Sequence, residues 1–337
     1  MRAAVFHGIG IPLAIEQIED PEPRPGQLLV EVSHCGICGS DIHMTEREGL
    51  IKAGVVLGHE FAGTVVEGGS GQIRPGTRVT ALPLLPCWTC DECREGHLFH
   101  CVRPDLVGVS ANGAYAEAVA VDERLVQPLP AGVSFEDGAL VEPLAVGRRM
   151  VGLAEDLKGA NILIQGGGPV GMAGLIFARL GGAGRIVVSE INPARREKAL
   201  ELGADAVIDP STEDLAARAA SLCGARPDIV FECVGRPGMF AGAVAAVRPR
   251  GQIVSAGASF QYDGFVPIDA LVKEITIRFS AGYTLADFEA ITNAMAHGRI
   301  EGERLVTGRI GLRDLPNIFE NLREPSGHCK VLVDIRA

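Results

Sequence analysis

The sequence has no cluster of lysine and arginine residues and no long apolar run, and each absence excludes a class of function. Its 31 Lys and Arg residues stand against 42 Asp and Glu residues, and the formal net charge is -11. Nucleic-acid partners require a basic face, so we expect none. No apolar run reaches the roughly 20 residues that a membrane span needs. The first residues, M-R-A-A-V-F-H-G, also lack the apolar core of a signal peptide. These absences predict a cytoplasmic protein that does not bind a membrane.

The cysteines are too unevenly placed for a disulfide framework. Nine form an odd set, and four of them fall between Cys87 and Cys101. In a reducing compartment this clustering indicates metal binding, with redox chemistry of the cysteines as the weaker alternative. The length of 337 residues exceeds what one ordinary core supports, which predicts two domains.

The most informative stretch is C-G-I-C-G-S-D-I-H at residues 35–43, followed later by Gly58-His59-Glu60. Zinc accepts sulfur, nitrogen and oxygen ligands at one tetrahedral centre and needs an open position for catalysis. The run 55–66 predicts a strand broken at Gly58, where irregular backbone can point His59 and Glu60 inward. These residues predict part of a catalytic zinc site, although a buried cysteine with surface histidines fits this stretch equally well.

The first part of the chain has the pattern of a β structure. Residues 2–6 and 28–33 are β-branched or apolar runs on either side of a proline-rich turn. They predict that the protein opens as an antiparallel β unit. Helical spacing of useful length first appears over residues 135–151.

Four cysteines lie on one short loop: Cys87, Cys90, Cys93 and Cys101. The loop is too short to hold itself by a hydrophobic core. Four thiolates at this spacing predict a closed, tetrahedral structural zinc site. His97 and His100 are redundant once four sulfurs are counted, so we expect them at the surface.

Glu142 stands between apolar neighbours, directly before Pro143. A carboxylate in such surroundings is usually hydrogen-bonded or bound to a metal. The alternative is an acid in the first turn of a helix that complements the helix dipole.

A nucleotide-binding pattern follows at residues 161–190. A short buried strand, 161–165, runs into Gly-Gly-Gly-Pro-Val-Gly at 166–171 and then into an apolar helix. The glycines permit a tight turn and the close approach of a pyrophosphate, which the helix N-terminus stabilises. A second strand ends in Glu190, where an acid accepts hydrogen bonds from ribose hydroxyls and repels a 2′-phosphate. The cofactor should therefore be NAD.

Strands and helices continue to alternate as far as residue 256. The expected helices are 193–202, 212–222 and 240–247, and the expected strands are 206–208, 228–233 and 251–256. This alternation predicts an α/β protein with a parallel, doubly wound sheet. Helices near 287–297 and 312–321 and a last strand at 330–335 form a tail that we expect to return to the first domain.

Taken in order along the chain, these motifs resemble those of the zinc-dependent medium-chain alcohol dehydrogenases. The resemblance rests on C-G-I-C-G-S-D-I-H, G-H-E-F-A-G-T-V, the four-cysteine lobe, E-P-L-A-V-G and G-G-G-P-V-G. It implies a doubly wound parallel Rossmann sheet plus a mainly-β GroES-like catalytic domain. The implied domains are 1–143, which includes the structural-zinc lobe 87–101, the NAD-binding domain 144–280, and a return to the first domain over 281–337. The resemblance also implies a homo-oligomer, with a tetramer favoured over a dimer.

The resemblance implies a role for each residue of the first motifs. Cys38 and His59 hold the catalytic zinc, and Glu60 or Glu142 completes its shell. Asp41 orients His59, which fixes the tautomer of the ring and strengthens the ligand.

A proton relay is implied as well. The hydroxyl of Ser40 passes the proton of the substrate to His43 and so to solvent, a route that the S-x-x-H spacing permits if the segment is helical. The hydride goes to the nicotinamide, with Val170 packed behind the ring.

The implied cofactor contacts lie in the second domain: Gly166, Gly168, Pro169, Val170, Gly171, Glu190, Asn192, Arg195, Val234, Ala256 and Gly257. Arg195 and Arg196 could instead offer a 2′-phosphate a bidentate partner, which would favour NADP. We expect Glu190 to decide in favour of NAD, because the arginines fall on the following helix.

The expected substrate is an alcohol that is oxidised to its ketone. E-P-L-A-V-G resembles the branch that contains sorbitol, threonine and butanediol dehydrogenases, which mostly oxidise secondary alcohols. Polyol enzymes of this branch tend to carry an arginine where this chain has Ala281-Gly282-Tyr283. The expected pocket liners are mainly apolar: Leu84, Leu85, Met44 and Tyr283. We therefore expect an uncharged, partly hydrophobic secondary alcohol, with a small polyol or vicinal diol as the alternative.

Two other classes fit the sequence less well. A quinone-reductase-like binder of NAD(P)H would lack Cys38, His59 and the cysteine lobe. A metal-binding module without enzymatic activity would not need the glycine loop and its acid.

Overall fold

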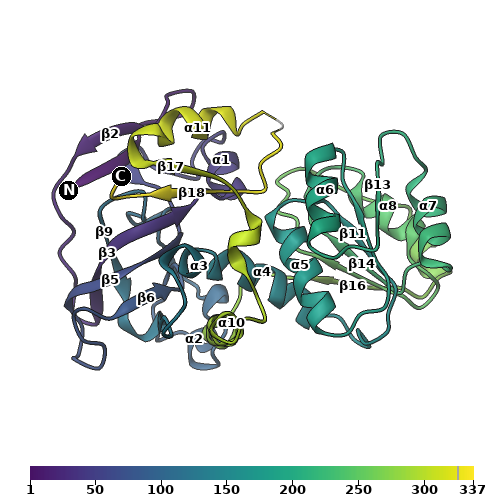
Figure 1. The fold of residues 1–337 in the computed structure, drawn as a ribbon, viewed down its shortest axis with the longest axis horizontal. Coiled ribbons are helices and arrows are strands. Elements are labelled where there is room, and N and C mark those ends of the chain that lie inside the picture. Colours follow the sequence, from purple (N-terminus) through teal and green to yellow (C-terminus); the bar gives the residue numbers. More distant parts are fainter. Residues whose placement is uncertain (325) are drawn as a thin grey trace. The chain divides into compact units, whose positions relative to one another are not determined.

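The computed structural model of the protein describes residues 1–324 and 326–337, which form two compact units (Figure 1). The first unit comprises Met1–Glu142, Thr284–Ser326 and Lys330–Ala337, and the second comprises Pro143–Tyr283 and Gly327–Cys329. Among the described residues, no helix combines the length and apolarity that crossing a membrane requires.

The first unit is built mainly from β-sheets. A three-stranded sheet has the order β2-β1-β4, and a seven-stranded sheet has the order β10-β6-β5-β3-β18-β17 with β9 paired to β3. The bounds are β1 (Arg2–Phe6), β2 (Ala14–Gln17), β3 (Gln27–Gly36), β4 (Val55–Val56), β5 (Glu60–Gly68), β6 (Arg78–Ala81), β9 (Ala118–Asp122), β10 (Val126–Pro128), β17 (Val306–Gly311) and β18 (Lys330–Asp334). A further pair joins β7 (Leu84–Leu85) to β8 (Asp105–Leu106).

The antiparallel β structure expected at the start of the chain is confirmed, with its two strands in different sheets. β1 pairs antiparallel with β2 and β4, whereas β3 belongs to the other sheet and pairs with β5, β9 and β18. β2 follows β1 directly in the chain and closes a hairpin with it, so β1 has a nearer partner than β3. The predicted break at Gly58 is confirmed, because β4 ends at Val56 and β5 begins at Glu60.

The helices of the first unit are short. α1 (Gly39–Met44) and α2 (Asp91–Arg94) span less than two turns each, too little for a helical period to show in the sequence. The predicted helix 135–151 is two helices, α3 (Phe135–Ala139) and α4 (Val141–Gly152), of which α4 continues into the second unit. α10 (Leu285–Ala296) begins with a capping box of Thr284 and Asp287, and α11 (Leu315–Asn321) follows later.

The second unit is a six-stranded parallel sheet in the order β13-β12-β11-β14-β15-β16. Its strands are β11 (Ile162–Gln165), β12 (Ile186–Ser189), β13 (Ala206–Ile208), β14 (Ile229–Glu232), β15 (Gln252–Ser255) and β16 (Thr276–Phe279). Its helices are α5 (Pro169–Leu180), α6 (Pro193–Glu201), α7 (Leu215–Cys223), α8 (Met239–Ala246) and α9 (Pro267–Leu271). The order runs outward from β11 in both directions, and Figure 1 shows α5 and α6 on one side of the sheet and α7 and α8 on the other. The predicted parallel, doubly wound sheet is therefore confirmed.

Among the α-helices and strands that the sequence did not predict, three lie in the last third of the chain. β16 and α9 extend the parallel unit beyond residue 256, and β17 pairs in parallel with β18. In β16, Thr-Ile-Arg-Phe, the first and last residues are exposed and the two between them are half-buried. The strand β17 contains two glycines. Neither stretch shows the alternation of buried and exposed residues on which the prediction of a strand depends.

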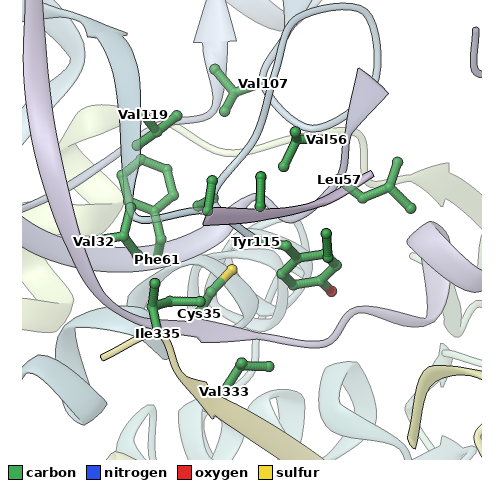
Figure 2. Packing of buried hydrophobic residues seen from close by; sticks show 14 of the residues in the cluster. Val32, Cys35, Val56, Leu57, Phe61, Val107, Tyr115, Val119, Val333 and Ile335 are labelled. Atoms are coloured by element: carbon green, nitrogen blue, oxygen red, sulfur yellow. The ribbon is translucent and has the colours of Figure 1, made fainter. Parts of the chain in front are cut away.

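The core of the first unit packs around Tyr115. Figure 2 shows this fully buried residue among apolar side chains that include Val56, Phe61 and Val333. The cluster includes residues from Met1 to Ile335, so this core joins both ends of the sequence.

Candidate active site

Three residues of the first unit bring potential metal ligands together. Cys38 is the residue before α1, His59 lies in the break before β5, and Glu60 begins β5. Their ligand atoms all lie within 4.8 Å of one another. One sulfur, one imidazole nitrogen and one carboxylate oxygen at such spacing match the donor set and the coordination distances of zinc.

Two glycines make room for this arrangement. Gly36 on β3 lies opposite Glu60 on β5, and a Cβ at Gly36 would stand 2.0 Å from Oε2 of Glu60. Gly58 has a φ of +90°, in the left-handed region that favours glycine, and turns the chain directly before His59. The side chains of His59 and Glu60 can approach the site because the glycines beside them have no side chain of their own.

Asp41 lies beside His59, as the resemblance implies. Its Oδ1 is 3.0 Å from Nδ1 of His59, and Asp41 is fully buried. Burial by itself lowers the pKa of His59, but the negative charges of Asp41 and Cys38 outweigh it and raise this pKa well above its usual value. An imidazole among anionic groups is a place where a cation is stabilised, so these residues fit a zinc ion.

Lys330 belongs to this cluster, and the sequence contains no motif that identifies it. Its Nζ lies 2.6 Å from both carboxylate oxygens of Glu60, and both side chains are 1% exposed. Nζ also donates to the carbonyl of Ile37 at 3.0 Å. Burial lowers the pKa of Lys330, but the charge of Glu60 more than offsets this and raises it. The ammonium group therefore stays charged and contacts both oxygens of Glu60.

Glu142 is buried in the same unit but lies outside the group formed by Cys38, His59 and Glu60. Its charge also contributes to the raised pKa of Lys330. Both candidate carboxylates therefore act on one ammonium group.

The two expected relay residues lie on α1. The helix places Ser40 and His43 three residues apart on one face. The hydroxyl of Ser40 donates to the sulfur of Cys38 at 3.1 Å, and the exposed ring of His43 lies 3.7 Å from a carboxylate oxygen of Glu46. The helical condition for the relay is met, with Ser40 at the candidate ligands and His43 in solvent.

A second group of ligands is the cysteine lobe. The sulfurs of Cys87, Cys90, Cys93 and Cys101 all lie within 4.8 Å of one another. The hydroxyl of Thr89 and nearby backbone N–H groups lower the pKa of Cys87 to about 5. A thiol that ionises this readily is prepared for metal binding. His97 is exposed and contacts Glu92 at 3.2 Å, outside the group.

Trp88, the one tryptophan of the chain, anchors this lobe to the sheet. Its Nε1 donates to Asp122 at 2.6 Å, and the guanidinium of Arg124 lies 3.7 Å above its ring. Its position between Cys87 and Cys90 makes its fluorescence a reporter of the lobe.

In the second unit, Glu190 closes the glycine loop. Its Oε2 accepts from the N–H of Gly167 at 2.7 Å and its Oε1 from that of Asn192 at 2.8 Å. A Cβ at Gly171 would stand 1.9 Å from the carbonyl oxygen of Gly166, so this position admits only glycine. Helix α5 starts at Pro169, directly after the loop. The loop and the helix N-terminus have the form that accepts a pyrophosphate.

Glu232 is a second buried carboxylate in this unit, and no motif in the sequence identifies it. It accepts from the N–H groups of Val234 and Gly235 and from the hydroxyl of Ser255, each at 2.7 Å. Its carbonyl oxygen accepts from the N–H groups of Ala256 and Gly257. Glu232 therefore joins two loops that carry three of the expected cofactor contacts, Val234, Ala256 and Gly257.

The two arginines that could favour NADP are engaged elsewhere. Arg196 donates to the carbonyls of Glu190 and Ile191 at 2.8 Å and pairs with Asp209 at 3.0 Å. Arg195 donates to the carbonyl of His328 at 3.0 Å.

Comparison with known proteins relates both units to dehydrogenases. A family model for the alcohol dehydrogenase GroES-like domain matches residues 24–131, and one for zinc-binding dehydrogenases matches residues 169–297. Sorbitol dehydrogenase of Gallus gallus is 32% identical, with 96% of this chain and 94% of that protein covered. (R,R)-butanediol dehydrogenase of Bacillus subtilis is 33% identical, with 99% of each chain covered.

Solved structures agree with these relatives. A zinc-binding dehydrogenase from Sinorhizobium meliloti, solved with NADP, has a TM-score of 0.92 at 31% identity, with 99% of each chain covered. The structure of 2R,3R-butanediol dehydrogenase from Bacillus subtilis has a TM-score of 0.89 at 32% identity, again with 99% of each chain covered.

Replacing one cysteine in each group should separate their roles. We expect Cys38→Ser to remove one bound zinc and nearly all turnover while cofactor binding and Tm change little, because Cys38 belongs to the first unit and the glycine loop to the second. Cys93→Ser should lower Tm and change the emission of Trp88, because four sulfurs close the lobe. Metal analysis, cofactor titration and thermal unfolding measure these effects. Full activity of Cys38→Ser with its metal retained, or loss of only catalytic metal in Cys93→Ser, would contradict the assignment.

Proposed function

This chain belongs to the zinc-dependent medium-chain alcohol dehydrogenases, in the branch similar to sorbitol and butanediol dehydrogenases, and we propose that it oxidises a secondary hydroxyl of a vicinal diol or small polyol with NAD. The convergence of Cys38, His59 and Glu60 within 4.8 Å carries the proposal. We assign these residues, with Glu142 as the alternative carboxylate, to a catalytic zinc, and the four-cysteine lobe to a second, structural zinc.

The roles of the residues follow from their contacts. Zinc, when bound, acts as a Lewis acid that lowers the pKa of an alcohol. Asp41 holds His59 in one tautomer and orientation. The hydroxyl of Ser40, in contact with Cys38, takes up the proton of the substrate as it gives up its own toward His43. The exposed ring of His43 then releases a proton to solvent. Lys330 holds Glu60 in place through both of its carboxylate oxygens.

The relatives favour the diol over a simple secondary alcohol. Sorbitol and butanediol each carry a hydroxyl beside the one that is oxidised. Leu84 and Met44, expected to line the pocket, are apolar, which suits the short carbon chain of a diol rather than a charged substrate.

A matched substrate pair tests this function. We expect 2,3-butanediol to give a kcat/KM about fivefold above that of secondary butanol, which has the same carbon chain, because one hydrogen bond to a second hydroxyl contributes on the order of 1 kcal/mol. NADH absorbance follows both reactions, and sorbitol serves as the longer polyol. Preference for the mono-alcohol would favour the alternative substrate class, and the absence of NAD reduction with all three would contradict the function.

Glu190→Ala tests the preference for NAD. Wild type should prefer NAD because Glu190 accepts ribose hydroxyls and repels a 2′-phosphate. The engaged Arg195 and Arg196 support this, whereas the Sinorhizobium meliloti structure was solved with NADP. The ratio of kcat/KM values for NAD and NADP gives a difference in transition-state free energy. We expect the variant to reduce this difference by roughly 1 to 3 kcal/mol. A wild-type preference for NADP would show that the arginines decide.

We also propose that the chain forms a homo-oligomer through β16. This strand ends the parallel sheet, so one side of its backbone lacks a strand partner within the described chain. Phe279 on the strand is 70% exposed, and Leu271 and Val272 before it are 68% and 67% exposed. A second copy related by a twofold axis would extend the sheet and cover these side chains. The surface supports a dimer as the basic unit of the expected tetramer.

The molecular mass of the protein in solution tests whether β16 forms a contact between two copies of the chain. We expect wild type to be an oligomer and Phe279→Asp to dissociate, because a charge would be buried at the contact. Ile11→Asp is the control, since Ile11 is similarly large and exposed but belongs to the first unit. Light scattering after size exclusion gives the masses. A monomeric wild type, or an unchanged mass of Phe279→Asp, would contradict the surface.

A further inference from the structure

Tyr115 is the largest of the fully buried side chains, and its one polar atom points at the candidate active site. Its hydroxyl donates to Oδ2 of Asp41 at 2.8 Å and lies 3.3 Å from the carbonyl of Gly36. The other oxygen of Asp41, Oδ1, faces Nδ1 of His59 at 3.0 Å. One carboxylate therefore links the tyrosine to the histidine, with a separate oxygen for each.

We propose that Tyr115 is a positioning residue for the metal site, acting on His59 through Asp41. A carboxylate held at one oxygen only can turn about its Cβ–Cγ bond, which moves the oxygen that faces the imidazole. The hydroxyl of Tyr115 fixes the second oxygen and so fixes the direction of the first. Nδ1 of His59 then stays on Asp41, and Nε2 remains for the metal.

The ring of Tyr115 acts on the same histidine from the backbone side. A Cβ at Gly58 would stand 2.5 Å from the tyrosine ring, so the ring packs directly on the residue before His59. The backbone N–H of Tyr115 donates to Leu57 at 2.9 Å, and that of Ala114 donates to Gly58 at 2.8 Å. The strand break that carries His59 is thus held by main-chain bonds and by the ring, while the hydroxyl holds the carboxylate.

The hydroxyl remains a donor under all ordinary conditions. Burial and then the charge of Asp41 raise the pKa of Tyr115 well above its usual value. The proton therefore stays on the tyrosine, which donates to Oδ2 of Asp41. Phenylalanine at this position would keep the packing on Gly58 and lose the bond to Asp41 together with the longer contact to the carbonyl of Gly36, which separates the role of the hydroxyl from that of the ring.

The experiment measures zinc release from the holoenzyme to a chelator, with Trp88 emission reporting the lobe zinc separately. Asp41→Asn should accelerate release from the catalytic site roughly 10- to 100-fold, the usual effect of losing the partner of a ligating histidine. Tyr115→Phe should accelerate it about 3- to 10-fold, since it loosens that partner without removing it. Release from the lobe should not change.

A double-mutant cycle distinguishes positioning from packing. In the Asp41→Asn background, Tyr115→Phe should add less than about twofold, because the group it orients is already altered. Thr292→Val is the control: its side chain is equally buried and its hydroxyl donates to the carbonyl of Glu289 at 3.1 Å within α10, a helix that carries none of the candidate ligands. It should leave the release of catalytic zinc unchanged even if Tm falls.

Two results would overturn the proposal. They are unchanged zinc release in Tyr115→Phe, and an effect of Tyr115→Phe that is equal in the wild-type and Asp41→Asn backgrounds. The proposal rests on the zinc assignment made above, and His59→Ala separates the two. If His59→Ala loses its zinc while Tyr115→Phe behaves as wild type, only the role of Tyr115 is wrong. Unchanged zinc content in His59→Ala overturns both.

Discussion

The buried ion pair between Glu60 and Lys330 is the interaction on which the geometry of the first unit depends. Glu60 begins β5 and Lys330 begins β18, and these strands flank β3 on opposite sides. The pair therefore bridges β3 at the end from which the chain runs into Cys38. Removing one partner of such a pair typically costs about 3 to 5 kcal/mol, because the other charge is left buried and unpaired. The same contact that holds three strands together places the candidate ligands.

Glu60 has two roles in this arrangement. Its carboxylate satisfies a buried ammonium group and at the same time lies among the candidate metal ligands. Asp41 is used in a similar way, since its two oxygens face Tyr115 and His59. Each acid near the site is thus oriented by a fully buried partner on a distant part of the chain. Rigid partners of this kind keep a site in one arrangement before substrate arrives.

In the second unit, buried carboxylates are stabilised by backbone N–H groups instead of a buried cation. Glu190 and Glu232 lie at the ends of parallel strands, and both are buried. Backbone N–H groups of the adjoining loops satisfy their charges. These bonds shape the glycine loop around Gly167 and the loop around Val234. The acids fix the backbone that is expected to hold the cofactor.

The sequence by itself determined the features that depend on spacing within a short stretch. The order of strand, glycine loop, helix and Glu190 predicted the parallel sheet, and the spacing of the four cysteines predicted the lobe whose sulfurs come together. The break at Gly58 was also visible, because a glycine among β-branched residues interrupts a strand locally.

Only the tertiary structure decided which distant residues meet. Lys330 stands 270 positions from Glu60 and Tyr115 stands 74 from Asp41, and no local pattern relates them. The partners of β1 and the edge strand β16 were likewise set by long-range pairing. A pattern records the local preferences of a chain, whereas a buried charge is stabilised by whichever group the completed fold places beside it.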